Sequence, residues 1–406
     1  MFSTSTIAKI IPSRTLRFYS STAPQKILRT PLYSSHVNLG GKMVPFAGYS
    51  MPVIYSGQSH IESHKWTRAH CGVFDVSHML QHRIVGPKAA DFLQTMCPTD
   101  FKALNNFQFH LSVLLNHEGG IVDDCIVTKH ADDSFYMVTN AACRAKDVGF
   151  ITSELARYSG NSDVKHETFE GVLLAIQGPE ARNVMARYTR SNLNNLYFGN
   201  TRFIDLKGFG TDEKFHVARS GYTGEDGFEI SIPNTKVGVE FFNALMEEPE
   251  VKPIGLGARD SLRLEAGMCL YGSELTDATT PIDSSLSWLV SKSRRTPDAT
   301  FNGASKILSQ IAHPKTVKAK RVGLQSTGPS PRHGNKIFST NEPAKQIGEV
   351  TSGSFAPSLG HNVAQAYIEK PYHKKNTDVL IQIRGKLRKA HVTKMPFVKD
   401  NYYRKN

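Results

Sequence analysis

Apolar runs of strand length alternate with polar turns through the middle of the chain. Three such runs follow one another, at 109–115, 121–129 and 135–139. The polar turns at 116–120 and 131–134 separate them, and this alternation predicts a meander of three strands.

The last quarter of the chain has a different pattern. A polar stretch at 291–300 predicts a connector. From about Val317, short apolar runs at 321–324, 346–350 and 379–383 are separated by glycine, proline and serine. Short runs with frequent turn residues are typical of all-β structure, so we expect a small C-terminal β-domain.

Two segments of the chain resemble each other. Residues 83–93 and 174–185 both consist of an apolar strand, a Gly-Pro pair and an apolar helix. Proline fits the first turn of a helix, where its missing N–H would have no partner. The similarity predicts two related α+β subdomains, although a chance recurrence of a common turn would give the same pattern.

Residues 219–229, R-S-G-Y-T-G-E-D-G-F-E, lie between two predicted strands at 215–218 and 228–232. Glycines allow the positive φ angles of a tight connection. The segment carries more acid and more glycine than a turn requires, so it is either a ligand loop or a solvated acidic turn.

Glycines also enclose a predicted helix at 255–267. Helical spacing places Arg259 and Arg263 on the same face as Leu262 and Ala266. An arginine on the apolar side of a short helix needs a planar anionic or aromatic partner. A dinucleotide loop is not favoured, because the third glycine of that motif is absent.

Composition limits the class of protein. The chain has 406 residues, 39% apolar and 21% charged, typical of a soluble globular protein with two or three domains. No apolar run reaches the roughly 18–20 residues that span a bilayer, so no membrane association is expected. The five cysteines are scattered and odd in number, which indicates a reducing compartment.

The N-terminus indicates where the protein works. No acid precedes Glu62, and residues 1–22 are rich in serine and threonine with Lys9, Arg14 and Arg17 among apolar residues. This is the composition of a mitochondrial presequence, so we expect the mature chain in the matrix. Removal of those three basic residues lowers the formal charge from +13 to +10. The remaining basic residues are dispersed, which does not favour nucleic acid as a partner.

Asp123 and Asp124 are adjacent in the predicted strand 121–129. Successive strand side chains point to opposite faces, so we expect that the two carboxylates do not share one site. The alternation does not tell which of them is functional. His60 and His64 have helical spacing, but no carboxylate lies at ligand spacing, so no metal site is expected.

Five motifs taken together resemble the T-protein family of the glycine cleavage system. They are F-D-V-S-H-M at 74–79, N-x-E-G-G-I-x-D-D at 116–124, S-G-Y-T-G-E-D-G-F-E at 220–229, G-x-G-A-R-D at 255–260 and M-P-F-V at 395–398. The resemblance runs from about Thr30 to Tyr403. It implies an α+β fold of three domains around a central folate-binding cavity. The implied domains are 27–78 with 167–290, 79–166, and a barrel-like domain at 317–404.

The resemblance also implies an activity. Members of the family transfer a methylene group from the aminomethyl-dihydrolipoyl arm of the H-protein to tetrahydrofolate and release ammonia. Tetrahydrofolate is thus the implied co-substrate, the lipoyl group comes from the H-protein, and no metal is implied. The P- and L-proteins of the same system are the implied functional associates.

Matching motifs carry the family's functional residues onto this chain. The essential acid corresponds to Asp124, and the implied folate contacts are Met79, Asn140, Tyr222, Glu229, Arg259 and Trp288. A carboxylate such as Glu229 can accept two N–H bonds from a pterin. With the ordinary aspartate pKa of about 3.9, Asp124 is expected to be ionised and to stabilise positive charge near N5 of the folate.

The excess positive charge suggests a docking surface. Arg294 and Arg295 are predicted to steer the acidic lipoyl carrier and the folate tail. Two other functions stay open from sequence. A folate-dependent iron–sulfur assembly factor of similar fold would carry a K-G-C-x-T-G-Q-E pattern, which is absent here. An RNA-binding scaffold would show salt-sensitive RNA binding and no stabilisation by tetrahydrofolate.

Overall fold

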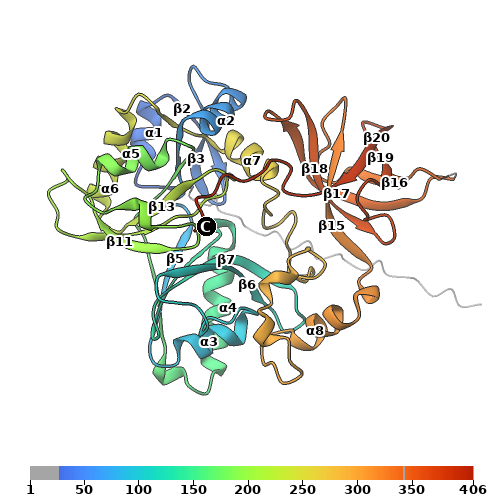
Figure 1. Ribbon diagram of the computed structural model, residues 1–406, viewed down its shortest axis with the longest axis horizontal. Helices are drawn as coiled ribbons and strands as arrows, with labels where there is room; N and C mark the ends of the chain where they lie inside the picture. Colours follow the sequence, from blue (N-terminus) through green and yellow to red (C-terminus); the bar gives the residue numbers. More distant parts are fainter. Residues whose placement is uncertain (1–26, 342, 406) are drawn as a thin grey trace, which may run out of the picture.

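The computed structural model describes residues 27–341 and 343–405 of the chain. The predicted presequence at 1–22 lies outside these residues. Three lobes are arranged around the middle of the molecule, two built on largely antiparallel sheets and one a barrel (Figure 1). Among the described residues, no helix combines the length and the apolarity needed to cross a membrane.

The first lobe is built on a six-stranded sheet in the order β11-β12-β13-β10-β4-β14. Its strands are β4 (Cys71–Asp75), β10 (Val172–Gln177), β11 (Thr201–Asp205), β12 (Lys214–Ala218), β13 (Gly227–Ile232) and β14 (Val251–Pro253). Four α-helices accompany the sheet: α2 (His60–Ala69), α5 (Ala181–Arg187), α6 (Thr235–Met246) and α7 (Leu256–Glu265). A small sheet precedes it in the sequence, with β1 (Leu28–Arg29), α1 (Tyr33–Asn38), β2 (Gly41–Phe46) and β3 (Tyr49–Tyr55).

The second lobe is built on a five-stranded sheet in the order β6-β7-β8-β5-β9. Its strands are β5 (Leu80–Val85), β6 (Gln108–Leu115), β7 (Ile121–Ala131), β8 (Ser134–Thr139) and β9 (Lys165–Phe169). The accompanying helices are α3 (Ala89–Met96) and α4 (Arg144–Arg157). The meander predicted at 109–139 is confirmed as β6, β7 and β8, paired antiparallel in that order.

The two sheets have the same design. Each contains three consecutive antiparallel strands, β6-β7-β8 or β11-β12-β13. The third of these pairs with the strand that begins the repeat, β5 or β10, and that strand pairs in turn with β9 or β4. The glycines after β5 and β10, Gly86 and Gly178, share a φ of 127°. A Cβ on either would lie 2.1 Å from a carbonyl oxygen, that of Asp163 or His70. A side chain cannot be placed there, so glycine is required at both positions. The predicted relationship between the two segments therefore holds in three dimensions.

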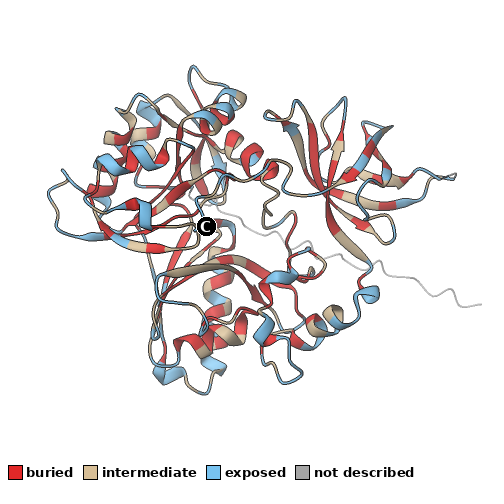
Figure 2. Cartoon of the chain, in the orientation of Figure 1, coloured by how far each residue is buried: buried red, intermediate tan, exposed pale blue. Residues whose placement is uncertain are grey.

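The third lobe is a closed six-stranded barrel in the order β15-β18-β17-β16-β19-β20, which confirms the predicted C-terminal β-domain. Its strands are β15 (Ala319–Ser326), β16 (Lys336–Ser339), β17 (Gln346–Ala356), β18 (His361–Glu369), β19 (Asp378–Ile383) and β20 (Lys386–Thr393). In the barrel strand β19, buried residues alternate with more exposed ones, whereas β4 and β10 of the first lobe are buried along their whole length (Figure 2).

The chain between α7 and the barrel packs against the second lobe. Leu275, Leu289 and Ile307 form one apolar core with Val113 of β6 and Ile121 of β7. The predicted connector at 291–300 includes the short helix η5 (Lys292–Arg294), and α8 (Ala304–Ala312) follows it. After β20, the tail at 394–405 runs from the barrel back across α7 to the middle of the molecule (Figure 1).

Candidate functional site

Asn140 joins the two adjacent aspartates. Its side-chain nitrogen donates hydrogen bonds of 2.9 Å to Asp123 Oδ1 and to Asp124 Oδ1, and its backbone N–H donates to Asp123 Oδ2 at 2.8 Å. Asp123 is fully buried and Asp124 is partly exposed, so the predicted alternation of faces holds.

The prediction that the two carboxylates do not share one site is wrong. Pairing between β7 and β8 ends at Cys125 and Thr139, so Asp123 and Asp124 lie beyond it. Asn140 is the first residue after β8, and at this open end of the sheet its amide contacts both carboxylates.

Asp124 is not an ordinary acid. Burial and the neighbouring charge of Asp123 raise its pKa to about 7, although the hydrogen bond from Asn140 opposes the rise. The prediction of an ordinary pKa is therefore wrong, because the strand end withdraws the carboxylate from bulk water and places a second acid beside it.

The glycine-rich segment is a loop of eight residues between β12 and β13, not a tight turn. Gly224, with a φ of 80°, is the one of its glycines that needs the left-handed region. Gly221 is required for a different reason, because a Cβ there would lie 1.8 Å from the side-chain oxygen of Gln177. The prediction of a tight connection therefore fails.

The acids of this loop hold it in place. Arg219, which is 1% exposed, pairs with Asp226 through Nε at 2.8 Å. Glu225, 2% exposed, accepts from Arg68 of α2 at 2.9 Å. These carboxylates are neither solvated nor free for a ligand, so the loop's own ion pairs fix the position of the residues between them.

Tyr222 and Arg259 are the aromatic and cationic parts of the site. The Arg259 guanidinium lies 4.8 Å from the Tyr222 ring centroid, and the Tyr222 hydroxyl donates to the carbonyl of Cys269. Arg259 comes from α7, which begins after Gly255 as predicted. Among the described residues no carboxylate lies within 4.0 Å of its guanidinium, so Arg259 forms no ion pair with Glu229.

The second arginine of α7 is structural. Arg263 is buried and pairs with Glu274 at 3.0 Å and with Asp260 at 2.8 Å. The predicted need of each helix arginine for an anionic or aromatic partner is thus met in two ways, by a ring for Arg259 and by carboxylates for Arg263.

The acid and the arginine–tyrosine pair face the same region. Burial raises the pKa of the Tyr222 hydroxyl, and the charge of Asp124 adds to that rise, while Arg263 and Arg259 oppose it. Such an influence requires Asp124 of the second lobe to lie near Tyr222 of the first. The site is therefore formed where the two sheets meet.

Glu229 and Met79 line the same region from the first sheet. Glu229 lies in β13 opposite Ala218, and Ser220 donates to one of its carboxylate oxygens at 2.6 Å. Met79 follows β4 and packs against the apolar cluster that includes Ala258 and Leu262 of α7. Both side chains are partly exposed, like those of Asp124, Asn140, Tyr222 and Arg259.

Trp288 lies farther out on the surface. It belongs to the short helix η4 (Ser287–Leu289), its side chain is 53% exposed, and its ring is 5.8 Å from that of His110 in β6. Its large exposed aromatic surface is unusual; of its neighbours in η4, Leu289 packs into the core and Ser287 is exposed.

Arg294 is not a free surface cation, so the prediction for it is wrong. It is 9% exposed, donates to the carbonyl of Gln94 at 2.8 Å, and lies 5.3 Å from the Phe301 ring centroid. Its apolar packing in η5 withdraws it from solvent. Arg295 is exposed, and its guanidinium donates to the carbonyls of Val290 and Ser287 at 3.0 and 2.9 Å.

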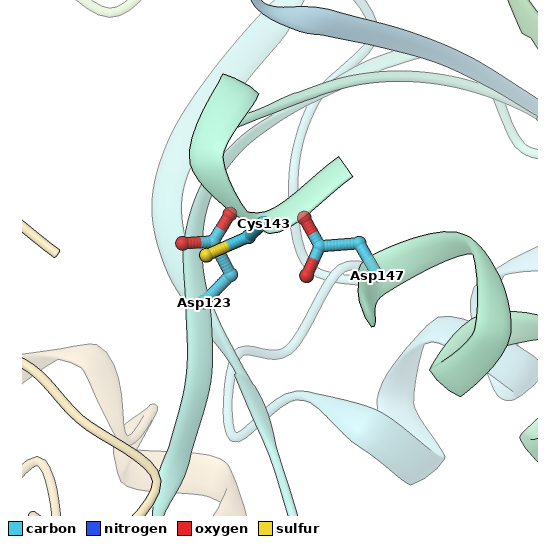
Figure 3. A group of neighbouring side chains, drawn as sticks. All are labelled: Asp123, Cys143 and Asp147. Atoms are coloured by element: carbon cyan, nitrogen blue, oxygen red, sulfur yellow. The ribbon is translucent and has the colours of Figure 1, made fainter. Parts of the chain in front are cut away.

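Sequence reasoning missed two neighbours of Asp123. The thiol of Cys143 and the carboxylate of Asp147 lie with Asp123 in one buried cluster, in which the three ligand atoms are within 4.8 Å of one another. Figure 3 shows the Asp147 carboxylate, from α4, directed toward Asp123. No sequence signal joins these residues, because they come from different elements.

An acid with a raised pKa near an arginine that lies over a tyrosine ring marks this region as a candidate functional site. Comparison with known proteins identifies which kind. The GCVT N-terminal domain matches residues 32–294, and the glycine cleavage T-protein C-terminal barrel domain matches residues 320–399. The chain belongs to the glycine cleavage T-protein family, a family of transferases.

Individual relatives agree over nearly the whole length. The mitochondrial aminomethyltransferase of Saccharomyces cerevisiae is 49% identical over 389 residues, which cover 93% of this chain and 96% of the yeast protein. That of Canis lupus familiaris is 43% identical and covers 94% of this chain and 93% of its own. The crystal structure of aminomethyltransferase T of the glycine cleavage system from Bartonella henselae is 37% identical, with a TM-score of 0.83 over 93% of this chain and all of its own. These relatives do not favour an iron–sulfur assembly factor.

Proposed function

We propose that the chain is the aminomethyltransferase of the glycine cleavage system and works in the mitochondrial matrix. It transfers a methylene group from aminomethyl-dihydrolipoyl H-protein to tetrahydrofolate. The products are 5,10-methylene-tetrahydrofolate, ammonia and dihydrolipoyl H-protein. Family membership supports this reaction, and relatives such as the yeast protein are described as mitochondrial. The net-positive, acid-free N-terminal sequence agrees with that location.

The partly exposed carboxylate of Asp124 carries the mechanistic part of the proposal. The folate N5 and N10 bond to the methylene carbon, which loses its bonds to the amine nitrogen and the lipoyl sulfur. The protons released from N5 and N10 balance those taken up by ammonia and the thiol. Positive charge develops near N5, and the ionised Asp124, fixed by Asn140, would stabilise it.

The neighbouring groups suit a pterin. Glu229 can accept two N–H bonds from an aminopyrimidine edge. Ser220 donates to only one of its two carboxylate oxygens, and each oxygen can accept more than one hydrogen bond. Within the part of the chain that the structure describes, no hydrogen bond occupies the Arg259 guanidinium, which lies over the Tyr222 ring. We assign Met79 to the apolar wall of the proposed folate site. We assign Trp288 to its outer rim, where the part of the folate beyond the pterin would emerge.

The domain division follows the same proposal. We assign residues 27–78 with 167–290 and residues 79–166 to the two folate-binding domains, and residues 317–404 to the barrel. The six-stranded and five-stranded sheets support the first two, and the closed barrel supports the third. The tetrahydrofolate would lie between the two sheets, with the barrel joined to α7.

Partners follow from the reaction. The H-protein supplies the lipoyl arm, and the P- and L-proteins act on the same carrier. The reaction needs tetrahydrofolate as co-substrate and no metal. Arg295, exposed beside Trp288, remains our candidate for contact with the acidic carrier.

The test is a coupled assay with aminomethyl-loaded H-protein and tetrahydrofolate. We expect Asp124→Asn to lower kcat by on the order of 10²–10³, the usual cost of one preorganised group. Asp132→Asn makes the same change in the turn after β7, where the side chain is 93% exposed, and should keep wild-type activity. Full activity of Asp124→Asn would contradict the assigned role. Absence of methylene-tetrahydrofolate with wild type would contradict the proposed function.

A further inference from the structure

Behind Asp124 lies a second acid pair that the proposed reaction does not use directly. Asp123 comes from β7, Cys143 from the short helix η1 (Ala141–Cys143) and Asp147 from the first turn of α4. Both carboxylates are fully buried, and the thiol is 3% exposed. The two carboxylates face each other across the cluster (Figure 3).

The hydrogen bonds of the two acids are unequal. Both oxygens of Asp123 accept from Asn140, at 2.9 and 2.8 Å. Both oxygens of Asp147 are buried, and among the described residues neither has a donor in good hydrogen-bond geometry, although the Thr139 hydroxyl is near enough to lower the pKa of Asp147. An ionised carboxylate without a partner is very costly to bury, and a second carboxylate beside it increases the cost. A positive charge must therefore lie between the two acids, as a proton or as a metal ion.

The surroundings favour a proton over a metal ion. Buried structural metal sites use four protein ligands as a rule, and this cluster offers three. Asn140, the next polar group, turns its N–H toward Asp123 and so does not offer an oxygen. A proton needs no further ligand, because one carboxyl O–H can donate to the other carboxylate.

Few charged groups face the pair. Lys146, the neighbouring cation on α4, is held by the Tyr271 hydroxyl and by Asp277 at 3.2 Å. Asp124 faces it from the other side of Asn140. Burial and the charge of Asp147 raise the pKa of Asp123 to about 8, and burial raises that of Asp147 to about 7.

We propose that Asp123 and Asp147 share one proton, and that this buried pair is a positioning element for Asn140 and through it for the reacting carboxylate of Asp124. One proton leaves the pair with a single negative charge. That charge keeps the amide nitrogen of Asn140 directed toward the acids. The flipped orientation, with the amide oxygen toward them, is disfavoured because two acceptors would then face each other. The positioning role rests on the proposed function, whereas the shared proton does not.

The first experiment detects the proton itself. Infrared spectra are recorded at pH 6 on protein with ¹³C-labelled aspartate, in the Asp124→Asn background so that the third acid does not contribute. We expect an isotope-shifted carbonyl band of a protonated carboxylic acid. The band should disappear in Asp124→Asn/Asp147→Asn, because the new amide donates to Asp123 and leaves it ionised.

A matched control uses Glu154, a buried acid on the same helix that already pairs with Arg157 at 2.7 Å. Asp124→Asn/Glu154→Gln should keep the band unchanged. If the Asp147 variant does not fold, the infrared band of Asp124→Asn is followed against pH instead. A shared proton predicts that the band fades as pH rises toward 9. An absent band, or one that survives Asp147→Asn, overturns the shared proton. So does stoichiometric metal in the purified wild type that is lost in Asp147→Asn.

The second experiment addresses positioning. In Asp147→Asn, the charge that the pair shared is confined to Asp123, next to Asp124. The acid limb of the kcat/KM profile should therefore move to higher pH by on the order of one unit, the size of effect that a nearby like charge produces. A purely structural role would change thermal stability and leave that limb in place. A wild-type enzyme without transferase activity would instead contradict the proposed function and leave the infrared result intact.

Discussion

The side-chain nitrogen of Asn140 lies 2.9 Å from a carboxylate oxygen of Asp124 and donates a hydrogen bond to it. The same nitrogen donates to Asp123, so the amide is held from two sides. A hydrogen bond to the charged form of an acid lowers its pKa, and here it offsets part of the rise caused by burial. Asn140 therefore sets how much of Asp124 is ionised near neutral pH.

Replacement of Asn140 by leucine should shift the pH dependence of the reaction. Without the amide, the pKa of Asp124 rises further, because burial and the charge of Asp123 are no longer opposed. The acid limb of kcat/KM should move to higher pH, and activity at pH 7 should fall about fivefold for a rise of one pKa unit, since the ionised fraction drops from about one half to about one tenth. An unchanged limb would show that the amide does not act on Asp124.

Wild-type activity should itself depend on a group that titrates near neutrality. In the proposed mechanism Asp124 acts as the anion, and burial together with the charge of Asp123 raises its pKa to about 7. Activity should therefore rise with pH through about 7 and level off above it. An acid limb near pH 4 would mean that the carboxylate is as well solvated as an exposed aspartate. The measurement is kcat/KM against pH in buffers of constant ionic strength.

The sequence predicted elements whose patterns are local. The meander of β6 to β8, the Gly-Pro repeat and the helix after Gly255 each follow from spacing within one segment. The repeat even predicted a shared sheet design, because the same close backbone approach demands glycine at Gly86 and Gly178.

Other features depend on partners far away in the chain. The pKa of Asp124 depends on where β8 ends, because that end places Asn140 beside the carboxylate. The burial of Arg294 depends on its contacts with Phe301 and Gln94. Asp147 shows no pattern in sequence, since its significance comes from α4 packing beside β7. Alternation along one strand also could not show that the residue after a neighbouring strand would bridge both aspartates.

Arg259→Lys should weaken folate binding more than it lowers turnover. Lysine keeps the charge but loses the flat guanidinium that lies 4.8 Å from the Tyr222 ring and the fork that suits a planar ligand. We expect KM for tetrahydrofolate to rise on the order of tenfold, equivalent to about 1.4 kcal/mol. Tyr222→Phe is the matched control, because it keeps the ring and loses only the bond to Cys269. If Tyr222→Phe raised KM more than Arg259→Lys, the Tyr222 hydroxyl and not the Arg259 guanidinium would be the main folate contact.

The C-terminal tail should stabilise the loop at 219–226. Tyr403 stacks on Tyr197 with centroids 5.4 Å apart, and the buried Arg219 lies 4.1 Å from its ring centroid. Tyr403→Ala removes both contacts and should cost about 1–2 kcal/mol of unfolding free energy, measured by urea denaturation. Tyr33→Ala is a useful comparison, because Tyr33 meets a single arginine, Arg29, at 4.1 Å, and should cost less. Equal costs would mean that the tail does not hold the loop.

Glu265, at the end of α7, joins the first lobe to the barrel. It is fully buried, and it accepts from His64, Arg68 and Ser358. Although burial opposes the change, the hydrogen bonds from His64 and Ser358 lower its pKa to about 2. A depressed pKa means that the folded chain binds fewer protons than the unfolded chain. The stabilisation is therefore complete above pH 4.5, the unperturbed value, and is lost as pH falls toward 2.

Glu265→Gln should show how much of the acid sensitivity comes from this residue. The amide leaves His64 and Arg68 without their shared anion, and loss of one member of a buried ionic network costs about 3–5 kcal/mol. The variant should be destabilised at pH 7, and its stability should fall less steeply than that of wild type between pH 5 and 3. Glu62→Gln is the control, since Glu62 belongs to the capping box of α2 at an exposed site, where glutamine is also accepted, and the change should cost little stability. Parallel pH curves for Glu265→Gln and wild type would show that Glu265 does not titrate in this range.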